Sequence, residues 1–170
     1  LESYHYIGNG RKDDSIRFTG YPIFMDSGAF SMFTLGAEVD LDAYGEFLAT
    51  RSDYIEVASN VDAIGAGREA DSYKNQKILE AMRLPVAVCP VHHARDDDRW
   101  LVKYLDEGYP YIFLGGMVPE STPYLLEWLD RIWDKYLALP DGTARVKVHG
   151  FGLTTLELME RYPWYSVDST

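Results

Sequence analysis

Short apolar runs alternate with longer amphipathic stretches along most of this chain. Successive runs begin roughly 20 to 35 residues apart, which is the length of a βα unit. We therefore predict a strand at each run and helices between them. The six runs are Pro22–Met25, Tyr54–Ala58, Val86–Val91, Tyr111–Leu114, Val146–Val148 and Tyr165–Val167.

The stretches between the runs carry helix signals. Asp40 is a good N-cap for a helix over 41–50, and the pair Thr122-Pro123 opens a helix over 124–139 with proline at the first helical position. Thr154 and Glu157 form a capping-box pattern. Further helices are predicted over 69–82 and over 100–105, the latter after three aspartates. The first 20 residues are predicted to be loop.

Alternating strands and helices with apolar strands indicate an α/β fold with a parallel sheet. The dinucleotide-binding glycine pattern is absent after the first strand, which weakens a doubly wound sheet. Polar or glycine residues follow almost every run, and in a barrel those positions form one ring. We predict a truncated (β/α)8 TIM-type barrel of about six βα units. It forms a single domain, 1–170, cut from a longer chain. The ring positions are Asp26-Ser27-Gly28, Ser59–Asp62, His92-His93, Gly115-Gly116, His149-Gly150 and Asp168.

The composition limits which partners and which cellular location we expect. A formal net charge of -11 disfavours a broad basic face for nucleic acid, although a local groove stays open. The single cysteine, Cys89, cannot form an internal disulfide. The sequence has no secretory signal and no apolar run long enough to cross a bilayer. We expect a cytoplasmic protein with no membrane association.

Asp26 stands where an apolar run ends and a small-residue turn begins, in Met25-Asp26-Ser27-Gly28-Ala29-Phe30. One interpretation is a carboxylate that acts as general acid/base in a pocket, with Phe30 stacking on a flat ring. The other is an aspartate that caps its own turn. Both interpretations stay open from the spacing alone.

Two further carboxylates follow predicted strands. Asp168 ends the last run, and Asp62 comes after the second. Paired carboxylates serve substitution at an anomeric carbon, where one attacks and the other handles the leaving-group proton. Asp62 could accept hydrogen bonds from the N–H edge of a base. Both could also be turn or loop caps.

Other polar residues have weaker signals. Cys89, His92 and His93 suggest zinc, but they lack a recognisable zinc spacing, and adjacent strand residues point to opposite sides. A histidine that lines the pocket is the simpler interpretation, and we predict no metal site. The stretch from Gly152 to Thr155 opens a helix and could receive a phosphate.

Taken together, these motifs resemble the queuine/archaeosine tRNA-guanine transglycosylase superfamily. The likeness is greatest to its DNA-modifying relatives in phages and bacteria, the DpdA-like proteins. The segment Met25–Ser31 is similar to the family's Asp-Ser-Gly-Gly-Phe/Tyr-Gln motif, and Leu114-Gly115-Gly116 to its glycine-pair strand end. Residues 148–152 are similar to its apolar-Gly-x-Gly segment, and residues 166–169 fall where the family has its nucleophile.

The resemblance implies a base exchange in which an aspartate attacks C1′ of a guanosine, guanine leaves and a 7-deazaguanine enters. Asp168 then matches the nucleophile, and Asp26 matches the acid/base. Substrate contacts are implied for Ser27, Phe30, Asp62, Gly115, Gly116, His149 and Gly150.

The chain also departs from the family pattern. His149 stands where the family usually has an apolar residue, and the family's zinc segment would follow Asp168, so no cofactor is expected within this chain. The expected partners are DNA, favoured over tRNA, a 7-deazaguanine base and, as an option, another protein. Two alternatives stay open: a TIM-barrel hydrolase, metal-dependent or glycosidic, and a non-catalytic 7-deazaguanine-binding domain.

Overall fold

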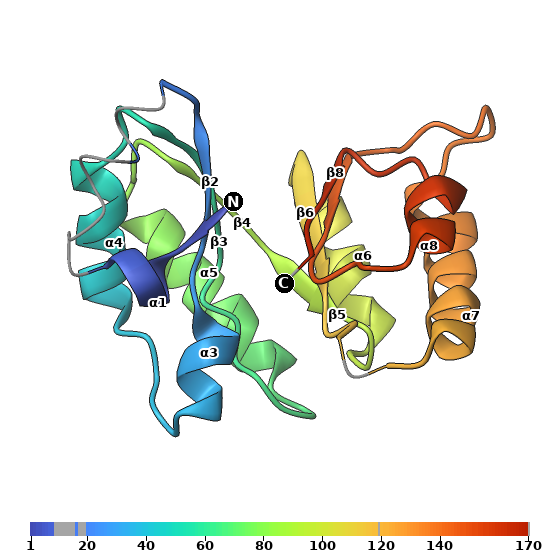
Figure 1. The fold of residues 1–170 in the computed structure, drawn as a ribbon, viewed down its shortest axis with the longest axis horizontal. Helices are drawn as coiled ribbons and strands as arrows, with labels where there is room; N and C mark the ends of the chain where they lie inside the picture. The colour runs from blue at the N-terminus through green and yellow to red at the C-terminus, as the bar shows by residue number, and fades with distance from the viewer. Residues whose placement is uncertain (9–15, 17–19, 119, 170) are drawn as a thin grey trace. The chain divides into compact units, whose positions relative to one another are not determined.

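The computed structural model describes residues 1–8, 16, 20–118 and 120–169. The chain divides into two compact units, residues 1–90 and 91–170. Each unit holds a four-stranded parallel sheet whose strands follow one another in chain order (Figure 1). The predicted α/β class with parallel strands is therefore confirmed.

The first unit contains strands β1 to β4, and every neighbouring pair is parallel. Helices follow the first three strands. The strands are β1 (Glu2–Ser3), β2 (Ile23–Asp26), β3 (Ile55–Ser59) and β4 (Ala87–Cys89), and the helices are α1 (Tyr4–Ile7), α3 (Ala29–Thr34), α4 (Leu41–Thr50) and α5 (Glu69–Ala81).

The second unit repeats this plan with strands β5 to β8. It also holds all four tryptophans of the sequence. The strands are β5 (Val91–His93), β6 (Tyr111–Gly115), β7 (Lys147–Gly150) and β8 (Ser166–Val167), and the helical segments are α6 (Asp98–Asp106), α7 (Thr122–Ile132), the π-helix η1 (Trp133–Leu137) and α8 (Leu156–Arg161).

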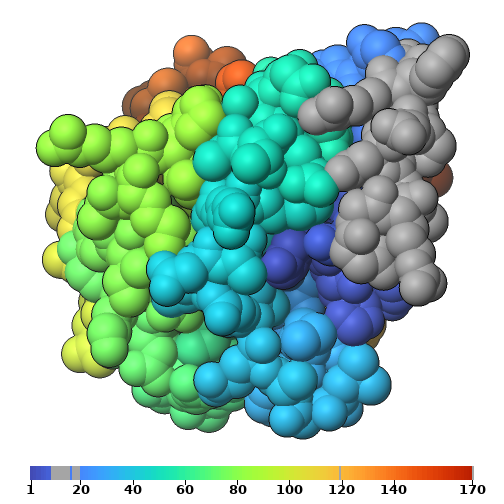
Figure 2. Space-filling view, turned by 90° about the vertical axis from the view of Figure 1, so that its left-hand side faces the viewer, coloured from blue at the N-terminus to red at the C-terminus, as the bar shows by residue number. Residues whose placement is uncertain are grey.

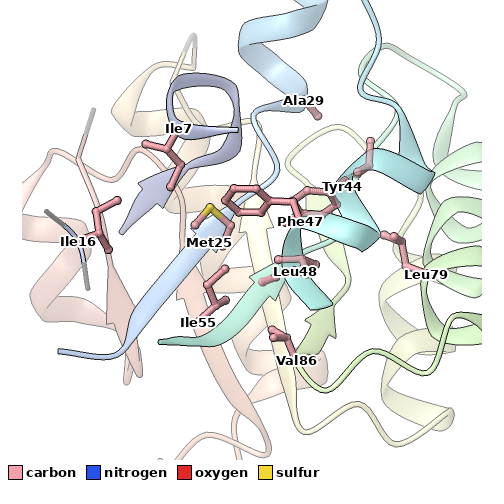
Figure 3. Close-up of a cluster of buried hydrophobic side chains, with 12 residues drawn as sticks. Ile7, Ile16, Met25, Ala29, Tyr44, Phe47, Leu48, Ile55, Leu79 and Val86 are labelled. Carbon is pink, nitrogen blue, oxygen red and sulfur yellow. The ribbon is translucent and has the colours of Figure 1, made fainter. Parts of the chain in front are cut away.

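The core of the first unit lies between its sheet and its helices. Met25 and Ile55 from the strands meet Leu48 of α4 and Leu79 of α5, and all four are buried (Figure 3). Helices α4 and α5 contribute much of the unit's outer surface (Figure 2). Burial of this apolar face fixes which side of each strand points inward and holds the strand ends in place.

Strand register sorts the side chains of the second unit onto two faces. Cα pairing of His149 with Phe113 and with Ser166 puts these three on the same face of the sheet. His92, one residue out of phase, lies against the Trp128 ring of α7, with ring centroids 6.4 Å apart. Helix α7 therefore covers the face opposite to His149.

All six apolar runs contain strands, but two strands were not predicted. β1 has only two residues, too few to produce an apolar run. The run Val86–Val91 and the two residues after it hold two strands, β4 and β5, which Pro90 separates. Proline has no N–H for a sheet ladder, so a break there follows from its chemistry.

Helix starts agree with the predictions at some capping residues and differ at others. The Asp40 side chain accepts a hydrogen bond from Ala43 N at 2.9 Å, as expected of an N-cap. Helix α8 begins one residue later than predicted, with Thr155 as an N-cap that makes no side-chain hydrogen bond. The segment predicted as loop contains β1 and α1, while 9–15 and 17–19 lie outside the described residues.

Within the described part of the chain, no helix combines the length and apolar character needed to cross a lipid bilayer.

Candidate functional site

Asp26 is the last residue of β2, as predicted, and its carboxylate is held from two sides. Gly28 N donates to Oδ2 at 3.1 Å, and Ser59 Oγ of β3 donates to Oδ1 at 3.5 Å. Asp26 therefore caps its own turn, as one of the two interpretations predicted. The bond to the neighbouring strand shows that Asp26 is also fixed against the sheet.

Ser59 connects Asp26 to the buried backbone behind it. Its hydroxyl oxygen accepts a hydrogen bond from Ser27 N at 2.8 Å, and its carbonyl oxygen accepts one from Tyr44 OH of α4 at 3.0 Å. Ser27, Tyr44 and Ser59 are all fully buried. Ser27, predicted to contact substrate, thus uses its N–H to fix the strand end.

The turn after Asp26 depends on Gly28, whose φ of 74° is in the left-handed region. A Cβ there would lie 2.6 Å from the Cβ of His5 in α1, so the two segments approach at this glycine. Helix α3 begins with the next residue. The turn leaves Phe30 59% exposed, which keeps its ring available for the predicted stacking on a base.

Asp26 and Asp62 both act electrostatically on the buried hydroxyl of Tyr44. Burial raises the pKa of Tyr44 well above its usual value, the negative charges of Asp26 and Asp62 raise it further, and a hydrogen bond to Ser59 works against them. The carboxylates that follow β2 and β3 are therefore close enough to act electrostatically on one hydroxyl. This places two predicted site residues at the same end of the first sheet.

Asp168 follows β8 directly, and its carboxylate is half-buried. Its Oδ1 accepts a hydrogen bond from Gly152 N at 2.8 Å and lies 3.5 Å from His149 Nε2 of β7. Burial raises the pKa of Asp168, but the contacts from His149 and Gly152 together lower it by more. Asp168 is therefore held as a carboxylate anion.

His149 connects Asp168 to two further side chains. Its Nδ1 lies 2.7 Å from Ser166 Oγ, and Ser166 Oγ lies 2.6 Å from Tyr111 OH of β6. The four side chains come from three neighbouring strands and the residue after the last one. His149 is 2% exposed.

The glycines predicted to leave room for a base are packed against aromatic rings of the chain. A Cβ on Gly115 would lie 2.8 Å from His93 Cδ2, and one on Gly116 would lie 3.0 Å from His93 Cβ. A Cβ on Gly150 would lie 3.1 Å from the Trp164 ring. The space that each missing side chain leaves is thus filled from within the second unit.

Two backbone N–H groups of the segment predicted to receive a phosphate bind Asp168. Gly152 N donates to its carboxylate, and Leu153 N donates to its carbonyl oxygen at 2.7 Å. A pocket of about 90 Å³ adjoins this segment. Its lining includes Gly152, Leu153, Thr154, Thr155 and, from the β6–α7 side, Met117, Thr122 and Leu125.

His92 and His93 point to opposite sides, as strand alternation predicted. His92 is fully buried against α7, whereas His93 is partly exposed and its Nδ1 lies 3.4 Å from Asp96 Oδ2. Among the residues that the structure describes, no three His, Cys, Asp or Glu side chains gather as a metal site would require. Cys89 is buried.

Three residues that shape the two strand-end sites were missed from the sequence: Tyr44, Tyr111 and Ser166. For Ser166 a signal existed, since it stands two residues before Asp168 and the period of a strand puts both on one face. Tyr44 lies in a predicted helix, and nothing in its spacing indicates a partner on β3.

Asp26 belongs to the first unit and Asp168 to the second. The structure brings Asp26 to Ser59 and into the electrostatic environment that it shares with Asp62, and it brings Asp168 to His149. That the two sites face one cavity stays a prediction. No protein-family model matches this sequence, and no curated protein sequence does either.

Proposed function

We propose that this chain is a base-exchange transglycosylase that replaces guanine in nucleic acid, DNA in preference to tRNA, with a 7-deazaguanine. The observation that carries the proposal is the half-buried Asp168 carboxylate at the end of a parallel strand, with its pKa below the usual value. An anionic carboxylate held in position suits nucleophilic attack on a sugar carbon.

The reaction needs two carboxylates in different protonation states. In the first step a carboxylate oxygen of Asp168 forms a bond to C1′ of the guanosine while the C1′–N9 bond breaks. The electron pair goes to N9 of the departing guanine, which takes a proton from the protonated Asp26. In the second step N9 of the 7-deazaguanine attacks C1′, returns a proton to Asp26 and releases the Asp168 carboxylate.

The base contacts in this proposal are those that the family resemblance implies. Phe30 offers an exposed ring for stacking, and Asp62 offers a carboxylate for the N–H edge of the base. Ser27, Gly115, Gly116, His149 and Gly150 would complete the wall. A base in duplex DNA must first leave its stack to reach such a pocket.

The proposed architecture is a (β/α)8 barrel. Two observations support it: each unit has four parallel strands in chain order, and helices follow most of these strands. Barrel enzymes carry their catalytic residues at the carboxyl ends of the strands. Asp26 and Asp168 both stand at such ends.

Covalent trapping tests the proposal. The full chain is incubated with guanine-containing duplex DNA, or with tRNA, and with isotopically labelled 7-deazaguanine, and the protein–nucleic acid adduct is isolated under denaturing conditions. We expect Asp168→Ala to abolish the adduct and Asp26→Asn to slow base exchange by about 10²–10⁴-fold. Asp141→Asn is the matched control, because the pKa of that exposed carboxyl is also lowered, by hydrogen bonds with Thr143.

Each alternative gives a different result in the same assay. A glycoside hydrolase also uses two carboxylates, but water takes the place of the incoming base, so guanine would leave without incorporation of the label. A binding domain would retain 7-deazaguanine without turnover. An adduct that persists in Asp168→Ala would contradict the proposed nucleophile.

A further inference from the structure

Four polar side chains form a continuous line across the second sheet, from Tyr111 through Ser166 and His149 to Asp168. The distances are 2.6 Å from Tyr111 OH to Ser166 Oγ, 2.7 Å from Ser166 Oγ to His149 Nδ1, and 3.5 Å from His149 Nε2 to Asp168 Oδ1. The first two are within normal hydrogen-bond range, and the third is a longer electrostatic contact.

Proton counting gives the line a direction. At 3.5 Å the contact between His149 Nε2 and Asp168 Oδ1 is electrostatic rather than a hydrogen bond, and it is favourable when the imidazole proton is on Nε2. In a neutral imidazole Nδ1 then accepts, and Ser166 O–H must donate to it. The Ser166 oxygen is in turn free to accept from Tyr111 O–H. The two hydrogen bonds thus run from the tyrosine toward the histidine, and the electrostatic contact continues the line to the aspartate.

The His149 ring is held by its packing as well as by these contacts. Phe113 and Phe151 meet it edge to face, with ring centroids 5.5 Å and 4.8 Å away. With His149 only 2% exposed, rotation of the ring would have to displace one of these aromatic groups. The two nitrogens therefore keep their assigned partners.

Both contacts to the Asp168 carboxylate reach the same oxygen. Gly152 N and His149 Nε2 approach Oδ1, and within residues 91–118 and 120–169 no hydrogen bond to Oδ2 is found. Among the described residues of this unit, the titratable groups that face Asp168 are His149 and, through Ser166, Tyr111. The contacts of the Asp168 carboxylate within these residues are thus concentrated on Oδ1.

We propose that His149 is a positioning residue which, oriented by Ser166 and Tyr111, anchors Oδ1 of Asp168 so that Oδ2 is the attacking oxygen. This rests on the proposed function, in which Asp168 is the nucleophile. As Oδ2 bonds to C1′, the carboxylate charge is lost to the ester and the electron pair of the broken C1′–N9 bond leaves with the base. The step needs no proton transfer to or from His149.

The line of contacts can be tested without any substrate. The titration of the Asp168 carboxyl is followed by carbon NMR in full-length protein labelled at aspartate and assigned with Asp168→Asn. We expect its midpoint to rise in His149→Ala toward that of an unperturbed aspartate, because a favourable contact with the anion is removed. His149→Gln, which keeps an amide donor at the place of Nε2, should restore part of the difference.

Tyr111→Phe removes only the hydroxyl at the far end of the line and guards against misfolding of the His149 variants. We expect a smaller rise of the same sign. Tyr162→Phe is the matched control, since it too removes one phenol from a mostly buried ring, at a bond to Asp130 on α7. It should leave the Asp168 titration unchanged. An unchanged Asp168 midpoint in both His149 variants and in Tyr111→Phe overturns the inference.

The trapping assay separates this inference from the proposed function. We expect His149→Ala to form the Asp168 adduct about 10²-fold more slowly, a loss typical of a misplaced reacting group. The acid limb of its pH profile should move to higher pH. If wild-type protein forms no adduct, the proposed function fails while the titration still decides the role of His149. An adduct mapped to Ser166 would overturn both, because Ser166 would then be the nucleophile.

Discussion

Asp26 and Asp168 end their strands in the same way but are held differently. Asp26 bonds to Gly28 N, two residues ahead in its own turn, and to Ser59. Asp168 bonds to Gly152 N, which comes from the loop after the neighbouring strand. A residue held by its own turn moves with that turn. Each carboxylate is nevertheless also bonded across to a neighbouring part of its sheet, Asp26 to Ser59 of β3 and Asp168 to the loop after β7.

A substitution of Gly28 is predicted to destabilise the fold for two separate reasons, one in the backbone conformation and one in the packing. Alanine would have to adopt a φ of 74° and would bring its Cβ to 2.6 Å from His5 Cβ. Gly36, two residues after α3 ends, has a φ of 72° and nothing within 4 Å of its Cβ position. Gly36→Ala therefore isolates the backbone cost of about 1–2 kcal/mol.

We expect Gly28→Ala to lose clearly more free energy of unfolding than Gly36→Ala, with urea denaturation as the measurement. The excess is the cost of moving α1 away from the turn. Equal losses in the two variants would mean that α1 gives way at no cost, and the close approach at Gly28 would then have no structural importance.

At the scale of elements, the packing of β5 against α7 buries an imidazole without hydrogen bonds. Neither ring nitrogen of His92 has a hydrogen-bond partner within the described part of the chain. Burial lowers the pKa of His92 to about 4, although Asp96 acts in the opposite direction. At neutral pH the ring is therefore uncharged, and the 3.9 Å approach to Asp96 is not an ion pair.

His92 should make the protein sensitive to mild acid. The unfolded chain binds a proton near pH 6.5, whereas the folded chain resists it down to about pH 4, so stability falls as the pH drops between these values. Between pH 7 and pH 5 the loss amounts to about 2 kcal/mol. Calorimetric unfolding at the two pH values measures it.

Two substitutions separate the titration of His92 from its burial. His92→Leu should match or exceed the wild-type stability at pH 7 and lose most of the pH dependence, since an unpartnered polar group is replaced by an apolar one. His92→Gln should lose the pH dependence but keep the cost of a buried polar group. If both variants keep the wild-type change of stability with pH, a group other than His92 is responsible for it.

The ends of helices and strands could be predicted where a single residue, such as an N-cap aspartate or a proline, determines the local backbone. Asp40 marks the start of α4 through its own hydrogen bond, as predicted, whereas α7 begins earlier than predicted, at Thr122 with Ser121 as its N-cap and Pro123 as its second residue. The division at Pro90 has the same kind of cause but was hidden inside an apolar run. The π-helical turn Trp133–Leu137 extends α7 and has no local signature in the sequence.

The candidate site was predictable only one strand at a time. Alternation and strand ends identify Asp26, Asp168 and His149 as separate positions. The partners that hold them, Ser59 and Ser166, are 33 and 17 residues away from Asp26 and His149 along the chain and become neighbours through strand register. Register depends on the packing of whole sheets, which a single sequence does not display.

At the scale of the whole molecule, the chain is two parallel sheets with a formal net charge of -11. Few arginines and lysines are available to neutralise phosphates, 16 in total against 27 acidic residues. Recognition of nucleic acid would then depend on contacts with an extruded base rather than on a wide basic face. The proposed pocket, with its exposed Phe30 ring and its carboxylates, is consistent with that mode.

The confinement of every tryptophan to residues 91–170 has an optical consequence. Indole emission reports on the second unit alone, whereas circular dichroism records the helices of both. Parallel denaturation curves should coincide if the predicted single domain melts as one cooperative body. Two different midpoints would instead show that the two units unfold separately. The midpoint measured by fluorescence would then be that of the second unit.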